Sequence, residues 1–253
     1  MTDFVNNNVT VVIRTVGERT ENLCRELVGK QIAQNNIHIV RENPFTEAVR
    51  ETLSIGIREN RKWTFAVDAD VLIRPGVIRE LLDYAEKVSA NVFKIGGKII
   101  DKFLDSPREA GTHWYRTKLM NHAIGLIPQP DAAIRPETYM RNAMKKKGFT
   151  FIKTDILTGL HDFEQYYRDI YRKCFVQAKK HQSRVLKLLP EWEEKAKTDN
   201  DFKVALAGFN AGVKYNGDVS IDINAPFLSG LDKEIKRLCL YEKETLKDYS
   251  LLE

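Results

Sequence analysis

Three β-branched runs, each followed by a stretch with helical periodicity, restrict the fold of this chain more than any other feature. The segments 9–15 (VTVVIRT), 37–40 and 63–67 (WTFAV) are typical of buried strands. The intervening segments carry apolar residues three and four positions apart, which predicts helices. Strands that alternate with helices imply right-handed βαβ crossovers and a mostly parallel sheet covered on both faces. The helices are expected over residues 20–32, from Thr46, and near Pro75.

The alternation changes after residue 91. Two short apolar runs, 92–95 and 98–100, flank Gly96-Gly97, a pair typical of a β-hairpin, so we expect a mixed sheet. A helix over 136–147 that ends at Gly148 and a final strand over 149–154 complete this part.

The remaining sequence is rich in helical periodicity. We expect long helices over 163–189 and 230–247, separated by a polar middle. The fold class that follows is α/β: a mixed, mostly parallel sheet flanked by helices, with a C-terminal helical extension. We place the core at residues 1–160 and the extension at 161–253, where the extension can bind a substrate, a membrane surface or a second copy of the chain.

Composition excludes several classes of protein. Of 253 residues, 43% are hydrophobic and 30% charged, as in ordinary globular proteins. Three widely spaced cysteines argue against a disulfide framework, and no apolar run approaches the ~18 residues of a membrane span. We therefore expect a cytoplasmic protein, with peripheral contact at the inner face of the membrane left open.

The net charge of +5 favours anionic partners. Nucleic acid is not expected among them, because basic and acidic residues are interleaved almost everywhere. The Lys145–Lys147 run is interpreted as the solvated basic end of a helix.

Asp68 and Asp70 follow directly on the apolar run 63–67. Ligands of open α/β sheets bind outside the carboxyl ends of the strands, so these two acids are expected in the cleft. A second D-x-D, Asp199 to Asp201, has no strand before it and is interpreted as a turn or helix cap. Carboxylate oxygens suit Mg²⁺ or Mn²⁺, and an imidazole from His161 would favour Mn²⁺.

Glu137 lies in the first turn of its expected helix, where it either stabilises the helix dipole or acts as a general base. His113 and Trp114 fall in a segment before that helix, and aromatic rings there would suit a sugar acceptor as well as a core. Asp162 is predicted to be the N-cap or a first-turn acid of the helix that follows it.

Taken together, these segments resemble a known family. VTVVIRTVGERT, Glu42 after the second strand, FAVDADVLIRPGVI and RPETYMRNAMKKKGFTFIKTDILTGLH are similar to the nucleotide-sugar-dependent glycosyltransferases of the GT-A fold, and most similar to glycosyltransferase family 2, over residues 9–161. The resemblance implies metal-dependent, inverting transfer of one sugar from a nucleoside diphosphate sugar to a glycan or lipid-linked acceptor, in surface glycan biosynthesis.

The resemblance also implies roles for individual residues. Asp70 and His161 would bind Mn²⁺ or Mg²⁺, Glu137 would be the catalytic base, and His113 and Trp114 would contact the acceptor. The donor would be bound by Thr15, Glu18, Glu42, Asp68 and Arg135.

Two departures from the family pattern stand out. Thr138 follows Glu137 where the family usually has a second acid, which leaves Asp131 as a substitute base. The Q-x-x-R-W motif of processive members is missing, which favours single-sugar transfer.

Other functions remain open. A haloacid-dehalogenase-like phosphatase also begins with a strand and D-x-D-V-L, although usually at the start of its fold. A non-catalytic nucleotide- or carbohydrate-binding module would keep the fold and lose the acids. A nucleic-acid acceptor would require salt-dependent DNA affinity.

Overall fold

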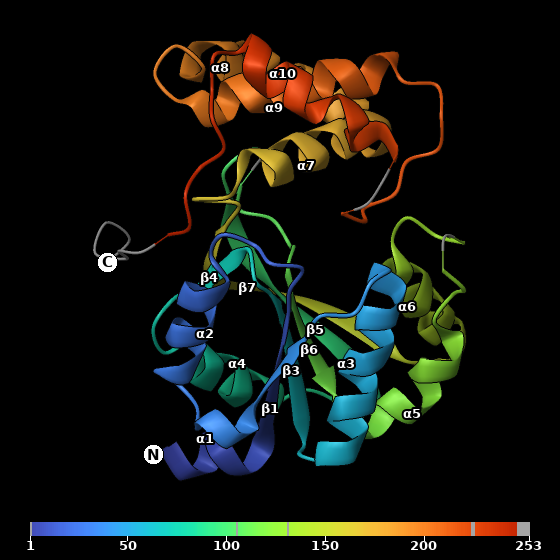
Figure 1. Cartoon of the computed structure of the whole chain (residues 1–253). Helices are drawn as coiled ribbons and strands as arrows, with labels where there is room; N and C mark the ends of the chain where they lie inside the picture. The colour runs from blue at the N-terminus through green and yellow to red at the C-terminus, as the bar shows by residue number, and fades with distance from the viewer. Residues whose placement is uncertain (1, 105, 131, 224–225, 247–253) are drawn as a thin grey trace. The chain divides into compact units, whose positions relative to one another are not determined.

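The computed structural model describes residues 2–104, 106–130, 132–223 and 226–246 (Figure 1). The chain divides into two compact units. One comprises Met1–Asp101 and Ser106–Phe163, and the other comprises Lys102–Asp105 and Glu164–Glu253. Nothing in the sequence signals that 102–105 belongs with the C-terminal helices.

The first unit is built on a seven-stranded mixed sheet with the order β2-β1-β3-β6-β5-β7-β4. β1 is parallel to β2 and β3, and β5 is parallel to β7. β6 runs antiparallel between β3 and β5, and β4 runs antiparallel to β7 at the edge. The strands are β1 (Val9–Arg14), β2 (Ile37–Val40), β3 (Trp63–Asp68), β4 (Val71–Ile73), β5 (Val92–Asp101), β6 (Thr112–Arg116) and β7 (Thr150–His161).

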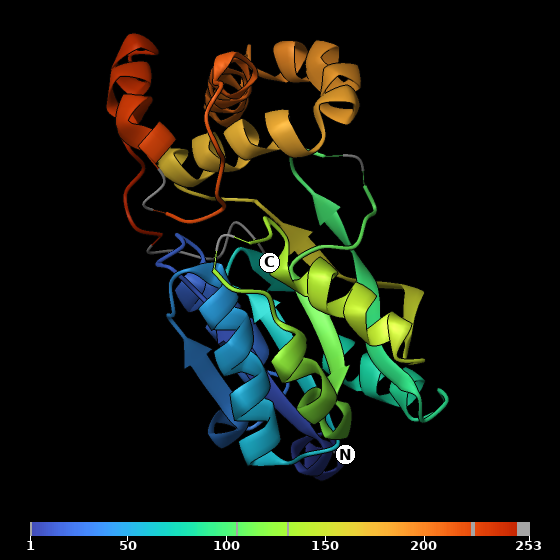
Figure 2. The same cartoon turned by 90° about the vertical axis from the view of Figure 1, so that its right-hand side faces the viewer.

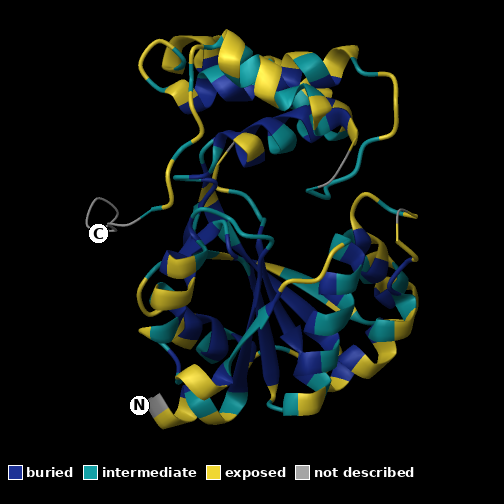
Figure 3. Cartoon of the chain, viewed as in Figure 1, coloured by how far each residue is buried: buried dark blue, intermediate teal, exposed yellow. Residues whose placement is uncertain are grey.

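Helices cover both faces of this sheet (Figures 1 and 2). α3, α5 and α6 pack together on one face, where Leu53, Met120 and Met140 share a buried cluster with Phe93 and Tyr115 of the sheet. α1, α2 and α4 lie on the other face (Figure 1). Figure 3 shows the strands themselves as the buried layer between the helices. The helices are α1 (Thr2–Asn8), α2 (Glu21–Gly29), α3 (Phe45–Glu59), α4 (Val77–Ala85), α5 (Met120–Ala123) and α6 (Pro136–Lys146).

The second unit is helical, with α7 (Tyr167–Lys180), α8 (Gln182–Lys195), α9 (Asn200–Lys214) and α10 (Leu231–Arg237). Its core is formed by aromatic side chains from several helices. Trp192 packs edge-on against Phe209 and donates from Nε1 to the Phe103 carbonyl at 3.0 Å, which ties Phe103 into this core. Gly212 lets α9 approach α7 closely, since a Cβ there would lie 2.4 Å from the Phe175 carbonyl oxygen.

These elements confirm the α/β class with a mixed sheet and a C-terminal helical region. The prediction of a hairpin at Gly96-Gly97 is wrong, because β5 is one continuous strand. A Cβ at Gly97 would lie 2.4 Å from Thr158 Cγ2. The glycine is therefore needed because β7 packs closely against it, and not because the chain turns there. The final strand is also longer than expected and runs to His161.

Several helix boundaries also differ from expectation. The first long C-terminal helix is broken at His181 into α7 and α8, and α9 occupies the middle that looked merely polar. α3 begins at Phe45, so Thr46 lies inside it. Asp199 is the N-cap of α9, as predicted: its side chain accepts a hydrogen bond from the Asp201 amide at 2.8 Å. Of the expected helix 230–247, α10 covers the first part, and residue 247 lies outside the described residues.

Among the helices of the described part of the chain, none is both long and apolar enough to cross a bilayer.

Candidate functional site

Strand register brings the D-x-D turn and the end of β7 to one place. β4 and β7 are antiparallel with Val71 opposite His161, and β5 and β7 are parallel with Asp101 opposite His161. The Asp162 amide donates to the Asp70 carbonyl at 3.1 Å. Side chains distant in sequence therefore meet where these strands end.

Asp70, His161 and Asp162 form a candidate metal centre. One potential ligand atom from each residue lies within 4.8 Å of the other two, and His161 Nε2 is 3.6 Å from Asp70 Oδ1. Both His161 and Asp162 are buried, and Asp70 is half-buried. Two carboxylates and an imidazole fit Mn²⁺ or Mg²⁺, with the imidazole favouring Mn²⁺.

The imidazole of His161 is oriented by a buried carboxylate. His161 Nδ1 lies 2.8 Å from Asp101 Oδ2, and Arg108 Nε donates to the same oxygen at 2.8 Å. Because an ionised carboxylate only accepts hydrogen bonds, Nδ1 carries the proton and Nε2 keeps its lone pair on the side of Asp70. Metal-binding histidines commonly have this carboxylate behind them.

A buried arginine joins Asp68 to Glu137. Arg14, 3% exposed, ends β1 opposite Asp68 of β3. Its Nε donates to Asp68 Oδ1 at 2.8 Å and its Nη1 donates to Glu137 Oε1 at 2.7 Å. Burial raises the pKa of Asp68, Arg14 opposes that rise, and Asp70 and Glu137 add to it, which leaves the pKa at about 7.

Glu137 accepts two further hydrogen bonds from β6. The Tyr115 hydroxyl donates to Oε1 at 2.9 Å, and His113 Nε2 lies 2.7 Å from Oε2. Burial alone would raise the pKa of Glu137, but the charge of Arg14 and the hydrogen bond from His113 outweigh it and hold the pKa well below its usual value. Burial lowers the pKa of His113 to about 4, so at neutral pH an uncharged imidazole donates to an ionised Glu137.

The loop after β1 lies beside the candidate metal centre. Glu18 Oε2 accepts hydrogen bonds from Thr15 Oγ1 at 2.7 Å and from the Val16 amide at 2.8 Å. Burial raises the pKa of Glu18, and the charge of Asp70 raises it further. Thr15 and Glu18 thus lie close to the acids of the site.

The other donor-binding candidates lie at the surface. Glu42 and Arg135 are both exposed. Partial desolvation of the guanidinium lowers the pKa of Arg135 although the residue as a whole is exposed, and the nearby charges of Arg108 and Arg141 lower it further. Within the described residues, no hydrogen bond or ion pair joins Glu42 to the site.

The assignment of Trp114 to the acceptor is corrected by its burial. Successive side chains of a strand point to opposite faces, so His113 faces Glu137 and Trp114 faces the core. Trp114 is 1% exposed and packs against Phe65 with ring centroids 5.2 Å apart. Asp131, the substitute base, lies outside the described residues.

The sequence alone did not assign Arg14, Asp101 or Asp162 to the site. Arg14 and Asp101 both end strands, and this position is the signal that could have identified them. Asp162 does not cap a helix, because α7 begins at Tyr167 and Asp162 has a φ of 68°.

Comparison with protein-family models and with curated proteins finds no match. Among solved structures, a mannosyltransferase from Pyrobaculum calidifontis in complex with GDP-Man and Mn²⁺ is 15% identical over 93% of this chain and 81% of its own, with a TM-score of 0.42. A glycosyltransferase involved in glycosylation of the major capsid of PBCV-1 is 12% identical over 58% and 82%, with a TM-score of 0.41. A cytidylyltransferase from Leptospira borgpetersenii is 10% identical over 58% and 75%, with a TM-score of 0.40.

The chain is thus structurally similar, at a distance, to GT-A glycosyltransferases and to nucleotidyltransferases.

Proposed function

We propose that the chain is a metal-dependent glycosyltransferase that moves one sugar from a nucleoside diphosphate sugar to a glycan or lipid-linked acceptor. The observation that carries the proposal is the meeting of Asp70, His161 and Asp162, within 4.8 Å, in the same unit as the Asp68–Arg14–Glu137 network. A candidate cation site and an ionised carboxylate, connected through the Asp68–Asp70 turn and Arg14, are the two parts such a transfer needs.

In this proposal, Asp70, His161 and Asp162 hold Mn²⁺ or Mg²⁺. The cation would neutralise the charge that develops on the departing nucleoside diphosphate. Asp101 keeps the His161 ring oriented for that task. Asp68 would accept hydrogen bonds from the donor ribose or sugar, with Thr15 and Glu18 beside it and Arg135 offering positive charge to the diphosphate. Glu42 would contact the donor as well, and this role rests on the family resemblance alone.

Glu137 would accept the hydrogen bond of the acceptor hydroxyl and take its proton as the glycosidic bond forms. A carboxylate with a depressed pKa is a weak base. Weak basicity suffices here, because a hydroxyl that attacks an oxocarbenium-like centre becomes strongly acidic as the bond forms. Arg14, Tyr115 and His113 hold Glu137 ionised and fixed in place before the acceptor arrives.

Direct displacement with the donor on one side and Glu137 on the other would invert the anomeric configuration. The first unit would be the catalytic core, and the helical unit would serve the acceptor, a membrane surface or self-association. Action in the cytoplasm, at the inner face of the membrane, on surface glycans belongs to the same proposal.

Donor hydrolysis over a panel of nucleoside diphosphate sugars, with and without Mn²⁺, tests the proposed function. The expected result is Mn²⁺-dependent release of a nucleoside diphosphate from at least one donor, which Asp70→Asn abolishes. Cleavage of a phosphate monoester with no turnover of any sugar nucleotide would support a phosphatase. Release of pyrophosphate from a nucleoside triphosphate would support nucleotidyl transfer.

A further inference from the structure

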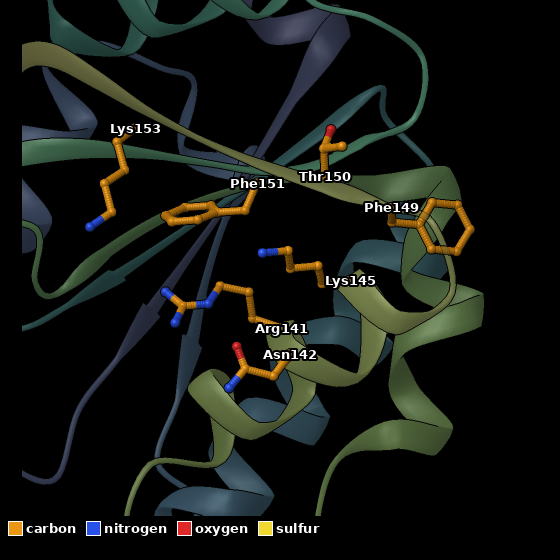
Figure 4. A pocket seen from close by; sticks show the side chains of 7 residues that line it. All are labelled: Arg141, Asn142, Lys145, Phe149, Thr150, Phe151 and Lys153. Atoms are coloured by element: carbon orange, nitrogen blue, oxygen red, sulfur yellow. The ribbon is translucent and has the colours of Figure 1, made fainter.

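A hollow in the first unit lies between α6 and the start of β7. It has a volume of about 320 Å³ and is lined by Arg141, Asn142, Lys145, Phe149, Thr150, Phe151 and Lys153. Figure 4 shows the side chains of Arg141, Lys145 and Lys153 gathered around Phe151, whereas the Phe149 ring points away. The lining therefore combines three cations with one aromatic surface.

The cation of Arg141 is held in position without an anion. Its guanidinium carbon lies 5.0 Å from the Phe151 ring centroid, which fixes the side chain and leaves its N–H groups for a ligand. Within the described part of the chain, neither Arg141 nor Lys145 forms an ion pair with a carboxylate. Lys153 is 3.9 Å from Glu109 Oε2, and Lys94 is 3.2 Å from Glu109 Oε1, so this one carboxylate is shared by two lysines.

The hollow is also connected to Glu137 through the helix. Glu137, Arg141 and Lys145 follow at intervals of four residues and so share one face of α6. Four residues advance a helix by about 6 Å. A group bound at Arg141 would therefore lie about one helical turn from the carboxylate of Glu137.

We propose that this hollow, the basic pocket, binds the phosphate of a phosphorylated acceptor whose reacting hydroxyl lies at Glu137. The inference rests on the proposed function and names the chemical class of its acceptor. A planar guanidinium and two ammonium groups around one space match the tetrahedral oxygens of a phosphate monoester or diester. The lysine run that looked like a solvated helix end thus divides, since Lys145 lines the pocket and Lys146 and Lys147 do not.

Calorimetric titration with glycerol 3-phosphate tests the pocket directly, with glycerol as the control that lacks phosphate. The double variant Lys145→Ala/Lys153→Ala should weaken binding at least about 10-fold, because each lost contact is a charge-assisted hydrogen bond. The double variant Lys146→Ala/Lys147→Ala removes the same charge from the same region and should stay within about 2-fold of the unmodified protein. Phe151→Leu should weaken binding also, because it frees the Arg141 side chain.

Vesicles of phosphatidylglycerol in phosphatidylcholine identify the source of the phosphate. Binding of vesicles that depends on Lys145 and Lys153 assigns it to a lipid headgroup, and binding of glycerol 3-phosphate alone assigns it to a soluble monoester. Equal weakening in both double variants, or no binding of either probe, would overturn the proposal.

Phosphate binding in the basic pocket and the proposed sugar transfer can be refuted independently. Binding of a nucleoside diphosphate sugar with Mn²⁺, measured on the same variants, should be unchanged, because the pocket residues do not touch the candidate metal centre. Absence of donor binding in the unmodified protein would refute the proposed transferase function. The glycerol 3-phosphate titration tests phosphate binding in the basic pocket independently.

Discussion

Replacement of Arg14 by methionine should destabilise the first unit strongly and in a pH-dependent way. Arg14 is 3% exposed and donates hydrogen bonds to both Asp68 and Glu137. Breaking a buried ion pair by removing one partner costs about 3–5 kcal/mol, because the remaining charge is left buried and uncompensated. Such a loss is a large fraction of the 5–15 kcal/mol that typically separates folded from unfolded domains.

The pH dependence follows from Glu137. In the unmodified protein its pKa is lowered, chiefly by Arg14 against the effect of burial, so its contribution to stability is present above the unfolded pKa of about 4.5 and is lost as the pH falls. Without Arg14 the ionised carboxylate of Glu137 destabilises the folded state, and protonation of Glu137 relieves this destabilisation. The free energy of unfolding should therefore fall more at pH 7.5 than at pH 4.5.

Urea denaturation followed by circular dichroism at the two pH values measures this effect. The matched control is Arg79→Met, which removes an exposed ion pair with Asp83 and should cost about 0.2–1 kcal/mol. The triple variant Arg14→Met/Asp68→Asn/Glu137→Gln should recover part of the loss, because it leaves no unpaired charge. A loss below about 1 kcal/mol for Arg14→Met, or one independent of pH, would refute the reasoning.

Three further predictions concern the site. Asp101→Asn should lower Mn²⁺ affinity by about 10- to 100-fold in electron paramagnetic resonance titrations, because the amide keeps an acceptor for His161 Nδ1 but loses the negative charge that orients the ring and raises its basicity. Gly111→Ala should cost about 1–3 kcal/mol in thermal unfolding, since Gly111 has a φ of 61° and its Cβ would lie 2.4 Å from Val71 Cγ2. Glu137→Gln should slow single-turnover sugar transfer by about 10²- to 10⁴-fold with donor affinity unchanged. An unchanged Mn²⁺ affinity in Asp101→Asn, an unchanged thermal stability in Gly111→Ala, or an unchanged transfer rate in Glu137→Gln would contradict the corresponding prediction.

Much of the fold could be predicted because local patterns determine it. β-branched runs over 9–15 and 63–67 and the helical stretches after them are visible without tertiary contacts. The Gly96-Gly97 pair misled because glycines have two uses, in turns and where another chain segment comes close. Only the pairing of β5 with β7, sixty residues further on, reveals which use applies.

The site was predictable to the same extent. Strand-end position placed Asp70 and His161 in one cleft, and the structure brings them within 3.6 Å. Asp101 also ends a strand, but its contact with His161 depends on the register between β5 and β7, which the sequence does not show. The prediction that Trp114 contacts the acceptor failed because a short aromatic segment does not show which of its side chains point to which face of the sheet. In β6, His113 faces the site and Trp114 faces the core.

The binding of Mn²⁺ together with a nucleoside diphosphate, followed by electron paramagnetic resonance, tests the central claim most directly. The account predicts a bound Mn²⁺ signal with at least one of the common nucleoside diphosphates, weakened by a factor of at least about 10 in both Asp70→Asn and His161→Ala. Unchanged Mn²⁺ binding in these two variants, or no nucleotide binding by the unmodified protein, would contradict it.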